Sequence, residues 1–328
     1  MLIAVDAMGG DYAPAEIVKG AIMGSRLWNV DIVLVGDEKA IQANLPASYD
    51  KSRIKIKHAS EVIAMGDHVD AVRTKRDASV VVAASMVKSG EADAVISLGN
   101  TAAAMAAGTL CVGRIRGIMR PAITLLLPTG KGVTVFLDVG AVADCTPGIM
   151  CQFALMGKVY SETVLGTKSP RVGLLSIGEE ASKGNEVTKA THEILVHTEN
   201  LNFIGNVEGR NLFDGTADII VADGFVGNVA LKVAEGVMEH MKSLLKEDLG
   251  NHPLSYVPMF MLSPLLKRIK KKFDYSEYGG APLLGLNGVF IVGHGRSNAH
   301  AVSNAVKAAK RAVEGNVVEA IRDAVSRQ

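Results

Sequence analysis

Six short loops of this sequence combine glycine with small polar side chains. They span residues 6–10, 99–101, 138–141, 184–186, 223–228 and 294–298. Small residues let a ligand approach the backbone closely, and Asn or Thr can cap a helix or hydrogen-bond a substrate. Such loops suit phosphate or a developing oxyanion better than a bulky apolar ligand. A plain turn with a helix cap is the better interpretation of any one loop, but the six together favour an anion site.

Lys183 is the strongest cationic candidate. It stands beside Gly184 and Asn185 on a loop that follows a strand-like apolar run and precedes a helical pattern. Most surface lysines are simply solvated. Here the ammonium group could hold an anion or a carbonyl oxygen that gains negative charge.

Apolar runs rich in Val, Ile and Leu must position these loops. They span residues 2–10, 31–37, 94–101, 122–129, 133–141, 171–180, 218–228 and 288–295. Alanine-rich helical patterns, as at 79–92 and 298–327, alternate with them, which predicts a parallel sheet covered on both faces. The runs 122–129 and 133–141 predict an antiparallel hairpin instead. We expect a three-layer α/β/α sandwich with a mixed, mostly parallel sheet, and all six loops at one rim, beyond the carboxyl ends of the strands.

Composition places the chain among soluble globular proteins. It has 328 residues, of which 48% are hydrophobic and 5% aromatic, and its formal net charge is +1. Balanced charge indicates no nucleic-acid partner. Cys111, Cys145 and Cys151 lack the number of a disulfide framework and the spacing of a zinc ribbon, so we expect reduced thiols. We expect neither a signal peptide nor a membrane span, because no apolar run reaches the ~20 residues that a span needs.

Signatures of several other enzyme classes are missing from the sequence. It contains no GxxxxGK[ST] and no strand-terminal GxGxxG with a ribose-binding acid, which disfavours ATP and ordinary Rossmann NAD binding. HExxH and GxSxG are missing too, so zinc and serine hydrolysis lack their local motifs. We therefore expect no covalent nucleophile, no cofactor and no metal.

Six ordered blocks carry a family resemblance over the whole chain. They are AVDAMGGDYAP (4–14), SLGNTAAAMA (97–106), LDVGA (137–141), IGEEASKGNE (177–186), NFIGNVEGRNLFDGTADIIVADGFVGNVALK (202–232) and YGGAPLLGLNGVFIVGHGRSNA (278–299). Together they resemble the bacterial acyl-[acyl-carrier-protein]:phosphate acyltransferases, which make acyl phosphate for phospholipid synthesis. Two places depart from the family's pattern: Ala102 stands where a glycine is usual, and Val142 and Ala143 stand within its GANxDC motif.

The resemblance implies a fold similar to isocitrate and isopropylmalate dehydrogenases and to phosphotransacetylases, with two intertwined lobes and a cleft between them. Residues 1–328 would form one catalytic unit, and the enzyme would be a homodimer. It would transfer a fatty acyl group from an acyl carrier protein thioester to inorganic phosphate. The implied partners are acyl carrier protein, phosphate and a membrane-embedded glycerol-3-phosphate acyltransferase that takes the product.

The family's active-site lysine and asparagine correspond to Lys183 and Asn228. We predict that Lys183 binds phosphate or the developing oxyanion, and that Asn228 hydrogen-bonds one reacting group. Further substrate-binding residues are expected in the small-residue loops: Asp6, Gly9, Gly10, Asn100, Thr101, Asn185, Asp223 and His294.

Residues 250–275 form an insert that departs from the rest in composition. An apolar stretch broken by Pro258 and Pro264 precedes five cations among the six residues from Lys267 to Lys272. One interpretation is a core helix with a solvated basic tail. We favour a bent hairpin that docks on a membrane surface, with its cations on anionic headgroups; the same cations could instead recruit the acidic carrier protein. The predicted docking residues are Met259, Phe260, Leu262, Leu265, Leu266, Lys267, Arg268, Lys270, Lys271 and Lys272.

Three other functions stay open. A dehydrogenase on the related fold would need a dinucleotide site and metal-binding aspartates, and Asp218 and Asp223 lack that context. A phosphotransacetylase would share the fold. A non-catalytic acyl-carrier or lipid-binding protein would not need Lys183. We expect a cytoplasmic protein that associates peripherally with the membrane.

Overall fold

A single eleven-stranded sheet organises the computed structural model, which describes residues 1–251, 262, 277 and 279–327. The strand order is β3-β2-β1-β4-β11-β10-β5-β6-β9-β7-β8. The strands are β1 (Leu2–Asp6), β2 (Asp31–Gly36), β3 (Ile54–His58), β4 (Ala94–Ser97), β5 (Ala122–Thr129), β6 (Gly132–Leu137), β7 (Val172–Leu175), β8 (Phe203–Val207), β9 (Ile219–Val221), β10 (Ala281–Leu284) and β11 (Val289–Val292). The sheet is mixed and mostly parallel, as predicted.

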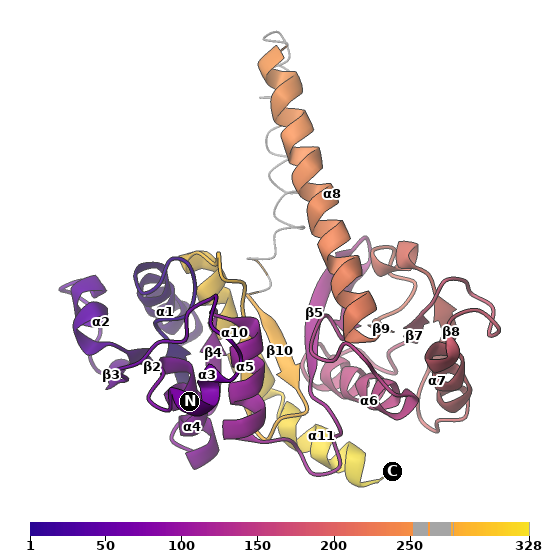
Figure 1. Ribbon diagram of the computed structural model, residues 1–328, viewed down its shortest axis with the longest axis horizontal. Coiled ribbons are helices and arrows are strands. Elements are labelled where there is room, and N and C mark those ends of the chain that lie inside the picture. Colours follow the sequence, from indigo (N-terminus) through magenta and orange to yellow (C-terminus); the bar gives the residue numbers. More distant parts are fainter. Residues whose placement is uncertain (252–261, 263–276, 278, 328) are drawn as a thin grey trace.

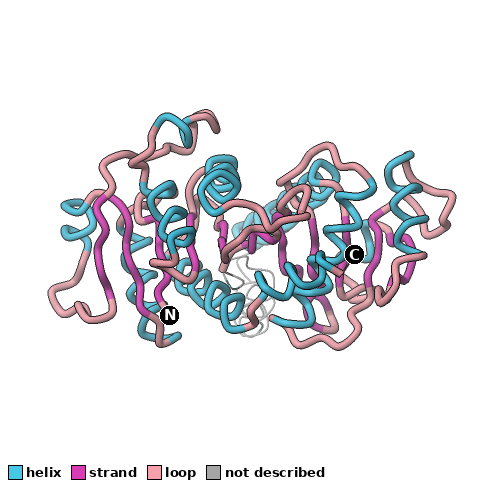
Figure 2. Tube along the Cα trace, turned by 90° about the horizontal axis from the view of Figure 1, so that it is seen from below, coloured by secondary structure: helices cyan, strands magenta, loops and turns pink. Residues whose placement is uncertain are grey.

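Helices lie on both sides of the strands (Figure 2). They are α1 (Ala15–Trp28), α2 (Glu38–Asn44), α3 (Ala71–Thr74), α4 (Ser79–Ser89), α5 (Thr101–Ala107), η1 (Gly108–Val112), α6 (Pro147–Thr163), α7 (Glu186–Val196), η2 (Gly209–Leu212), α8 (Gly224–Asn251), α10 (Ala299–Glu314) and α11 (Val317–Ser326). Alternate residues of a strand therefore face different cores. Ile3 and Val5 of β1 belong to one apolar cluster, and Ala4 belongs to the other.

The chain forms the first lobe, then the second lobe, and then returns to the first. The first lobe contains β3, β2, β1, β4 and β11, the second contains β6, β9, β7 and β8, and β10 and β5 join them. After the second lobe, the chain re-enters the first through β10 and β11. α10 then packs against α1 of the first lobe, and α11 packs against α6 of the second. The carboxyl end of the chain thus ties the lobes together (Figure 1).

The strands of the two lobes run in opposite directions. Three successive antiparallel pairings, β11 with β10, β10 with β5 and β5 with β6, separate the parallel groups. Each antiparallel pairing reverses the strand direction. Because there are three of them, β6, β9, β7 and β8 run in the direction opposite to β1, β4 and β11. The prediction that all six loops share one rim is therefore wrong: they form two groups that leave opposite edges of the sheet. Local sequence patterns carry no information about this reversal, because long-range pairing decides strand direction.

Most predicted elements are present. The hairpin is confirmed, since Thr129 of β5 pairs with Gly132 of β6 and only Gly130 and Lys131 lie between them. Three strands were not predicted: β3 (IKIKH), β8 (FIGNV) and β10 (APLL), whose runs are interrupted by lysine, glycine and asparagine, or proline. The helical pattern at 298–327 divides into α10 and α11 because Asn316 adopts a left-handed conformation (φ 49°).

α8 projects from the body between the two lobes (Figure 1). It is 28 residues long, or about 42 Å at the α-helical rise. Within the part of the chain that the structure describes, no helix combines the length and apolar character that crossing a membrane requires.

Candidate functional site

The amino end of α8 forms the centre of the candidate site. α8 follows β9, and the carboxylate of Asp223 caps it by accepting the Val226 N–H at 2.9 Å. Asn228 follows in the next turn and borders an open pocket of about 440 Å³. The lining residues are Gly140, Ala143, Gly224, Phe225, Asn228, Val229, Lys232 and Val233. The side-chain amide of Asn228 thus lies beside a mainly apolar pocket wall.

Asp138, at the end of β6, organises the loop on the other side of this pocket. Its buried carboxylate accepts backbone N–H groups from Ile123 at 2.9 Å, Ala141 at 2.8 Å and Val142 at 2.7 Å. Burial raises the pKa of Asp138 to about 6, although these hydrogen bonds act in the opposite direction. The carboxylate therefore occupies the backbone anion site of this loop, and the loop's N–H groups are not available to phosphate.

Two glycines let α8 sit directly on this loop. A Cβ built at Gly224 would lie 2.6 Å from Asp138 Oδ2, and one at Gly227 would collide with the Asp138 carbonyl oxygen. Gly140, whose φ is 134°, faces Asn228, because a Cβ built there would lie 3.5 Å from Asn228 Nδ2. Asp138 thus fixes the loop, and the loop fixes the surroundings of Asn228.

Lys183 lies on the loop between β7 and α7, and its side chain is exposed. The Lys183 N–H donates to the Glu180 carbonyl at 3.0 Å, and the same carbonyl accepts the side-chain amide of buried Asn206 at 2.9 Å. Asn206 Oδ1 lies 2.9 Å from Nδ1 of His192 on α7. A hydrogen-bonded chain from α7 through β8 therefore anchors the backbone that carries Lys183.

Lys183 and Asn228 belong to the same edge of the sheet. β7 and β9 are adjacent and parallel, and Lys183 follows the first while Asn228 follows the second. Their loops therefore leave the sheet side by side. The roles predicted for the two side chains stay predictions, but the strand pairing places Lys183 on the loop after β7 and Asn228 near the start of the helix after the adjacent β9.

The second group of predicted residues lies in the first lobe. Buried Asp6 accepts the Ser97 hydroxyl at 2.7 Å, and burial raises its pKa. A Cβ at Gly9 would lie 2.5 Å from Asp6 Oδ2, and one at Gly10 would lie 3.0 Å from the Leu98 carbonyl oxygen. The structure thus brings Asp6, Gly9 and Gly10 together with the end of β4, at the edge opposite to Lys183.

The remaining predicted residues make local hydrogen bonds. Asn100 caps α5 by accepting the Ala103 N–H at 3.0 Å, and its amide donates to the carbonyl oxygens of Met65 and Asp67, each at 3.0 Å. Its polar atoms thus hold a neighbouring loop. Asn185 caps α7, Thr101 is the exposed first residue of α5, and Nδ1 of His294 accepts the Arg296 N–H at 3.1 Å.

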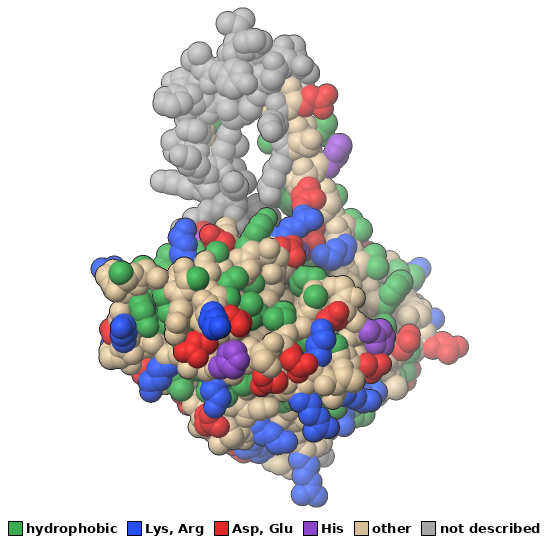
Figure 3. Space-filling view, turned by 60° about the vertical axis from the view of Figure 1, so that its left-hand side comes forward, with side chains coloured by type: hydrophobic (Ala, Val, Ile, Leu, Met, Phe, Trp, Pro, Cys, Tyr) green, Lys and Arg blue, Asp and Glu red, His purple; other side chains and the backbone are tan. Residues whose placement is uncertain are grey.

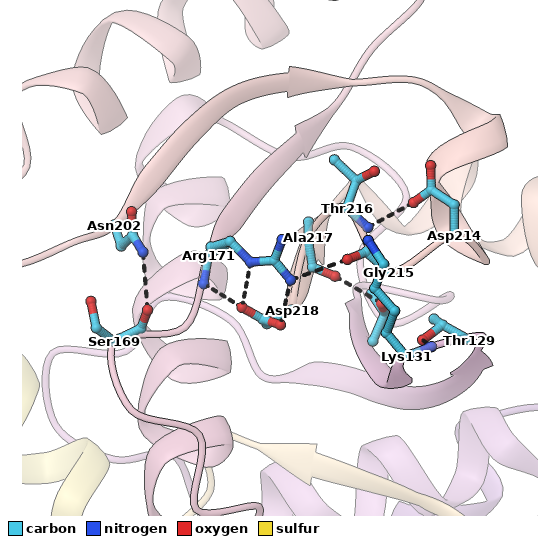
Figure 4. Close-up of polar contacts among 11 residues, drawn as sticks. Thr129, Lys131, Ser169, Arg171, Asn202, Asp214, Gly215, Thr216, Ala217 and Asp218 are labelled. Atoms are coloured by element: carbon cyan, nitrogen blue, oxygen red, sulfur yellow. Dashed lines mark hydrogen bonds and ion pairs between the residues drawn. The ribbon is translucent and has the colours of Figure 1, made fainter.

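Asp218 belongs to a polar cluster with Arg171 and Gly215 in the second lobe (Figure 4). It directly precedes β9, at the amino end of that strand, and Arg171 Nε and Nη2 donate to its two carboxylate oxygens at 3.0 and 2.9 Å. The Arg171 side chain holds the pKa of Asp218 below its usual value. This pairing gives Asp218 a structural partner away from Asn228. Among the described residues, no group of three or more His, Cys, Asp or Glu side chains could hold a metal ion.

The first two residues of the predicted docking insert, 250 and 251, end α8, and Leu262 is exposed; the rest of the insert lies outside the described residues. The other docking residues, which therefore stay predictions, are Met259, Phe260, Leu265, Leu266, Lys267, Arg268, Lys270, Lys271 and Lys272. On the face of the body that Figure 3 shows, acidic and basic side chains are interspersed. That face has no single-sign field of the kind that binds nucleic acid.

Sequence comparisons identify relatives over the whole chain. A family described as "Fatty acid synthesis protein" matches residues 1–320. A phosphate acyltransferase from Pelotomaculum thermopropionicum is 49% identical over 326 residues, which cover 99% of this chain and 95% of the relative. One from Desulfitobacterium hafniense is 49% identical over 329 residues, which cover 100% of this chain and 98% of the relative. A phosphotransacetylase structure from Streptococcus pyogenes shares the fold, with a TM-score of 0.64, 16% identity and coverage of 97% and 94% of the two chains. The chain therefore belongs to the fatty acid synthesis protein family and, within it, to the phosphate acyltransferases.

Proposed function

We propose that the protein transfers a fatty acyl group from an acyl carrier protein thioester to inorganic phosphate, giving acyl phosphate and free carrier protein. One observation of the structure carries this proposal: Lys183 and Asn228 follow neighbouring parallel strands, and Asn228 opens onto a pocket with an apolar wall. An ammonium group, an amide and an apolar surface match a reaction that joins phosphate to a fatty ester.

The reaction needs no nucleophile from the protein. A phosphate oxygen attacks the thioester carbonyl, a C–O bond forms, and the carbonyl oxygen takes the negative charge of a tetrahedral intermediate. The C–S bond then breaks, and the carrier's thiolate leaves and takes up a proton. The protein's main task is to orient the two reactants and to stabilise the developing charge. The nearby thiol of Cys145 fits this scheme, because burial raises its pKa to about 11 and keeps it protonated.

Lys183 and Asn228 have separate tasks in this proposal. Lys183 binds phosphate or the oxyanion, since two anionic reactants need positive charge between them. Asn228 donates or accepts a hydrogen bond at one reacting group. The backbone N–H groups of residues 140–142 take no part, because Asp138 accepts them.

Release of free thiol from an acyl carrier thioester, with and without phosphate, tests this function. Removing one such donor typically costs ~2.7–4 kcal/mol of transition-state stabilisation, so Lys183→Ala should lose roughly two to three decades of turnover. Lys189→Ala is the matched control, because Lys189 is an exposed lysine on the adjacent α7. Near-normal release by Lys183→Ala would remove Lys183 from the mechanism.

The same assay separates the other candidate functions. Release that requires phosphate supports the acyltransferase. Reduction of a nicotinamide cofactor would instead indicate a dehydrogenase, and binding of the acyl carrier without release would indicate a carrier- or lipid-binding protein. Use of acetyl-coenzyme A in preference to the acyl carrier would indicate a phosphotransacetylase.

The rest of the proposal concerns the oligomeric state, the fold and the membrane docking of the enzyme. The enzyme is a cytoplasmic homodimer with the isocitrate/isopropylmalate dehydrogenase-like fold. It docks peripherally on the membrane through residues 250–275, close to the membrane-embedded glycerol-3-phosphate acyltransferase that consumes acyl phosphate. The mixed two-lobed sheet supports the fold, and the cations of residues 267–272 support the docking.

A further inference from the structure

α8 exposes a row of large apolar side chains that begins inside the candidate site. Phe225 is 65% exposed, Val229 49%, Val233 60% and Val237 57%. These four residues, which we call the α8 strip, follow one another at intervals of four and so form one continuous row on the helix surface. Phe225, Val229 and Val233 also line the pocket beside Asn228. The strip is therefore the outward continuation of the pocket wall.

The chemistry of the pocket changes along α8. Asn228 supplies the polar group at its inner end, where Gly140 and Gly224 bring the backbone close. Lys232, the charged residue of the lining, is paired with Glu235 at 2.8 Å. Beyond them the strip offers hydrocarbon alone. A ligand that fits this order has a polar head and an apolar tail.

We propose that the fatty acyl chain of the substrate lies along the α8 strip, with its carbonyl group at Asn228 and its methylenes against Val229, Val233 and Val237. This inference rests on the proposed function and specifies where its substrate lies. From Asn228 to Val237 the helix rises about 13 Å, so the strip follows a long acyl chain over much of its length. Fully burying one methylene changes affinity roughly fourfold, so such a surface favours long chains over short ones.

A protein segment is a poorer occupant of the same surface. A second copy of this chain, or residues 252–278 folded back, would have to cover Val229 and Val233, which also line the pocket. A permanent cover there would close the pocket at Asn228 to substrate. An acyl chain arrives with the reacting group and leaves with the product, so it covers the strip without closing the site.

Chain-length selectivity tests the proposal. We expect Val233→Ser and Val237→Ser to lower kcat/KM for a palmitoyl carrier protein about tenfold, mainly through KM, and to leave a butyryl carrier protein within about twofold. An octanoyl carrier should lie between them. Val196→Ser is the matched control: Val196 ends α7 and is 55% exposed, close to the 60% of Val233. It should behave as wild type at every chain length.

The remaining outcomes overturn the proposal. Unchanged kinetics would show that the strip does not touch the acyl chain. An equal fall for all three chain lengths, whether or not light scattering shows a smaller oligomer, would show that the strip serves folding or assembly. Failure of the proposed function is distinguishable, because in that case the wild-type enzyme would release no thiol in the presence of phosphate from any of the three carriers.

Discussion

Each lobe ends one of its strands with a buried carboxylate that accepts hydrogen bonds from its surroundings. Asp6 is the last residue of β1, and Asp138 directly follows β6. In both places a glycine lies where a Cβ would press on the carboxylate oxygen, at Gly9 and Gly224. A phosphate cannot use donors that a carboxylate already holds. These aspartates are therefore residues that shape the loops, and in the proposed function the positive charge that binds phosphate comes from the side chain of Lys183.

The raised pKa of Asp138 predicts a specific dependence of stability on pH. The folded protein binds a proton at Asp138 up to about pH 6, whereas the unfolded chain releases it near the ordinary value of 3.8. Between these values the folded state holds more protons, so this group's contribution to the free energy of unfolding rises as the pH falls, by up to about 3 kcal/mol. We expect the stability difference between wild type and Asp138→Asn to change in that direction between pH 7 and pH 4.

Urea unfolding at a series of pH values measures this difference. Other carboxylates titrate equally in both proteins, so their contributions cancel. A constant offset is also expected, because the amide of Asn accepts fewer of the backbone N–H groups than the carboxylate does. A difference that stays flat across the range would mean that Asp138 keeps an ordinary pKa in the folded protein.

At the scale of the element, α8 depends on close contact at its first turn. Gly227→Ala would place a methyl group into the Asp138 carbonyl, and the helix must shift to relieve the clash. Overpacking of this kind typically costs about 1–3 kcal/mol, and here the shift also moves Asn228. We expect this variant to lose both thermal stability and phosphate-dependent thiol release.

Gly236→Ala is its control in the same helix. Gly236 is exposed, and a Cβ built there meets nothing within 4 Å. Because alanine favours a helix interior by about 0.8–1.0 kcal/mol over glycine, amide hydrogen exchange in α8 should slow several-fold while turnover is retained. Equal behaviour of the two variants would show that contact with the Asp138 carbonyl does not fix the helix.

Local sequence patterns predicted those elements in which apolar residues are buried and polar residues are exposed. Buried strands such as β1 and β2 are continuous apolar runs, and the amphipathic pattern of α10 is equally clear. The pattern fails in β8, where Asn206 breaks an apolar run. That asparagine is the residue that anchors the Lys183 loop. Its polarity within a strand was the available signal, but its partners on the Glu180 loop and on α7 are long-range contacts.

At the scale of the whole molecule, sequence showed which loops carry polar groups but not how they are grouped. The three antiparallel pairings between the lobes divide the predicted site residues into the set near Asp6 and the set near Asn228. No local pattern distinguishes a strand that runs up from one that runs down. Lys183 and Asn228 belong to the same end of the sheet because they follow β7 and β9, which are neighbouring parallel strands.

The proposed membrane docking concerns the whole molecule and is testable through the insert. Basic residues contribute about 1 kcal/mol each near an anionic bilayer, so reversing Lys267, Lys270 and Lys271 to glutamate should lower binding to anionic vesicles by at least about two decades. Added salt should weaken wild-type binding in the same assay, because it screens these charges. Vesicle flotation measures both effects.

A second triple reversal controls for net charge. Lys39, Lys51 and Lys168 are exposed and lie outside the insert, so changing all three to glutamate alters total charge equally. This control should float with the vesicles as the wild type does. If the insert variant also floats normally, the cations serve another partner, and binding of the acidic carrier protein becomes the quantity to measure.

The seat of α8 on the Asp138 loop makes the helix a lever. The pivot is the contact of Gly227 with the Asp138 carbonyl; Asn228 follows it directly, and the helix extends about 35 Å from the pivot to Asn251. A rigid rod turns at both ends together. A rotation of α8 about this contact therefore moves Asn228 by only a small fraction of the displacement at Asn251, so the position of the Asn228 amide is insensitive to motion of the far end of the helix.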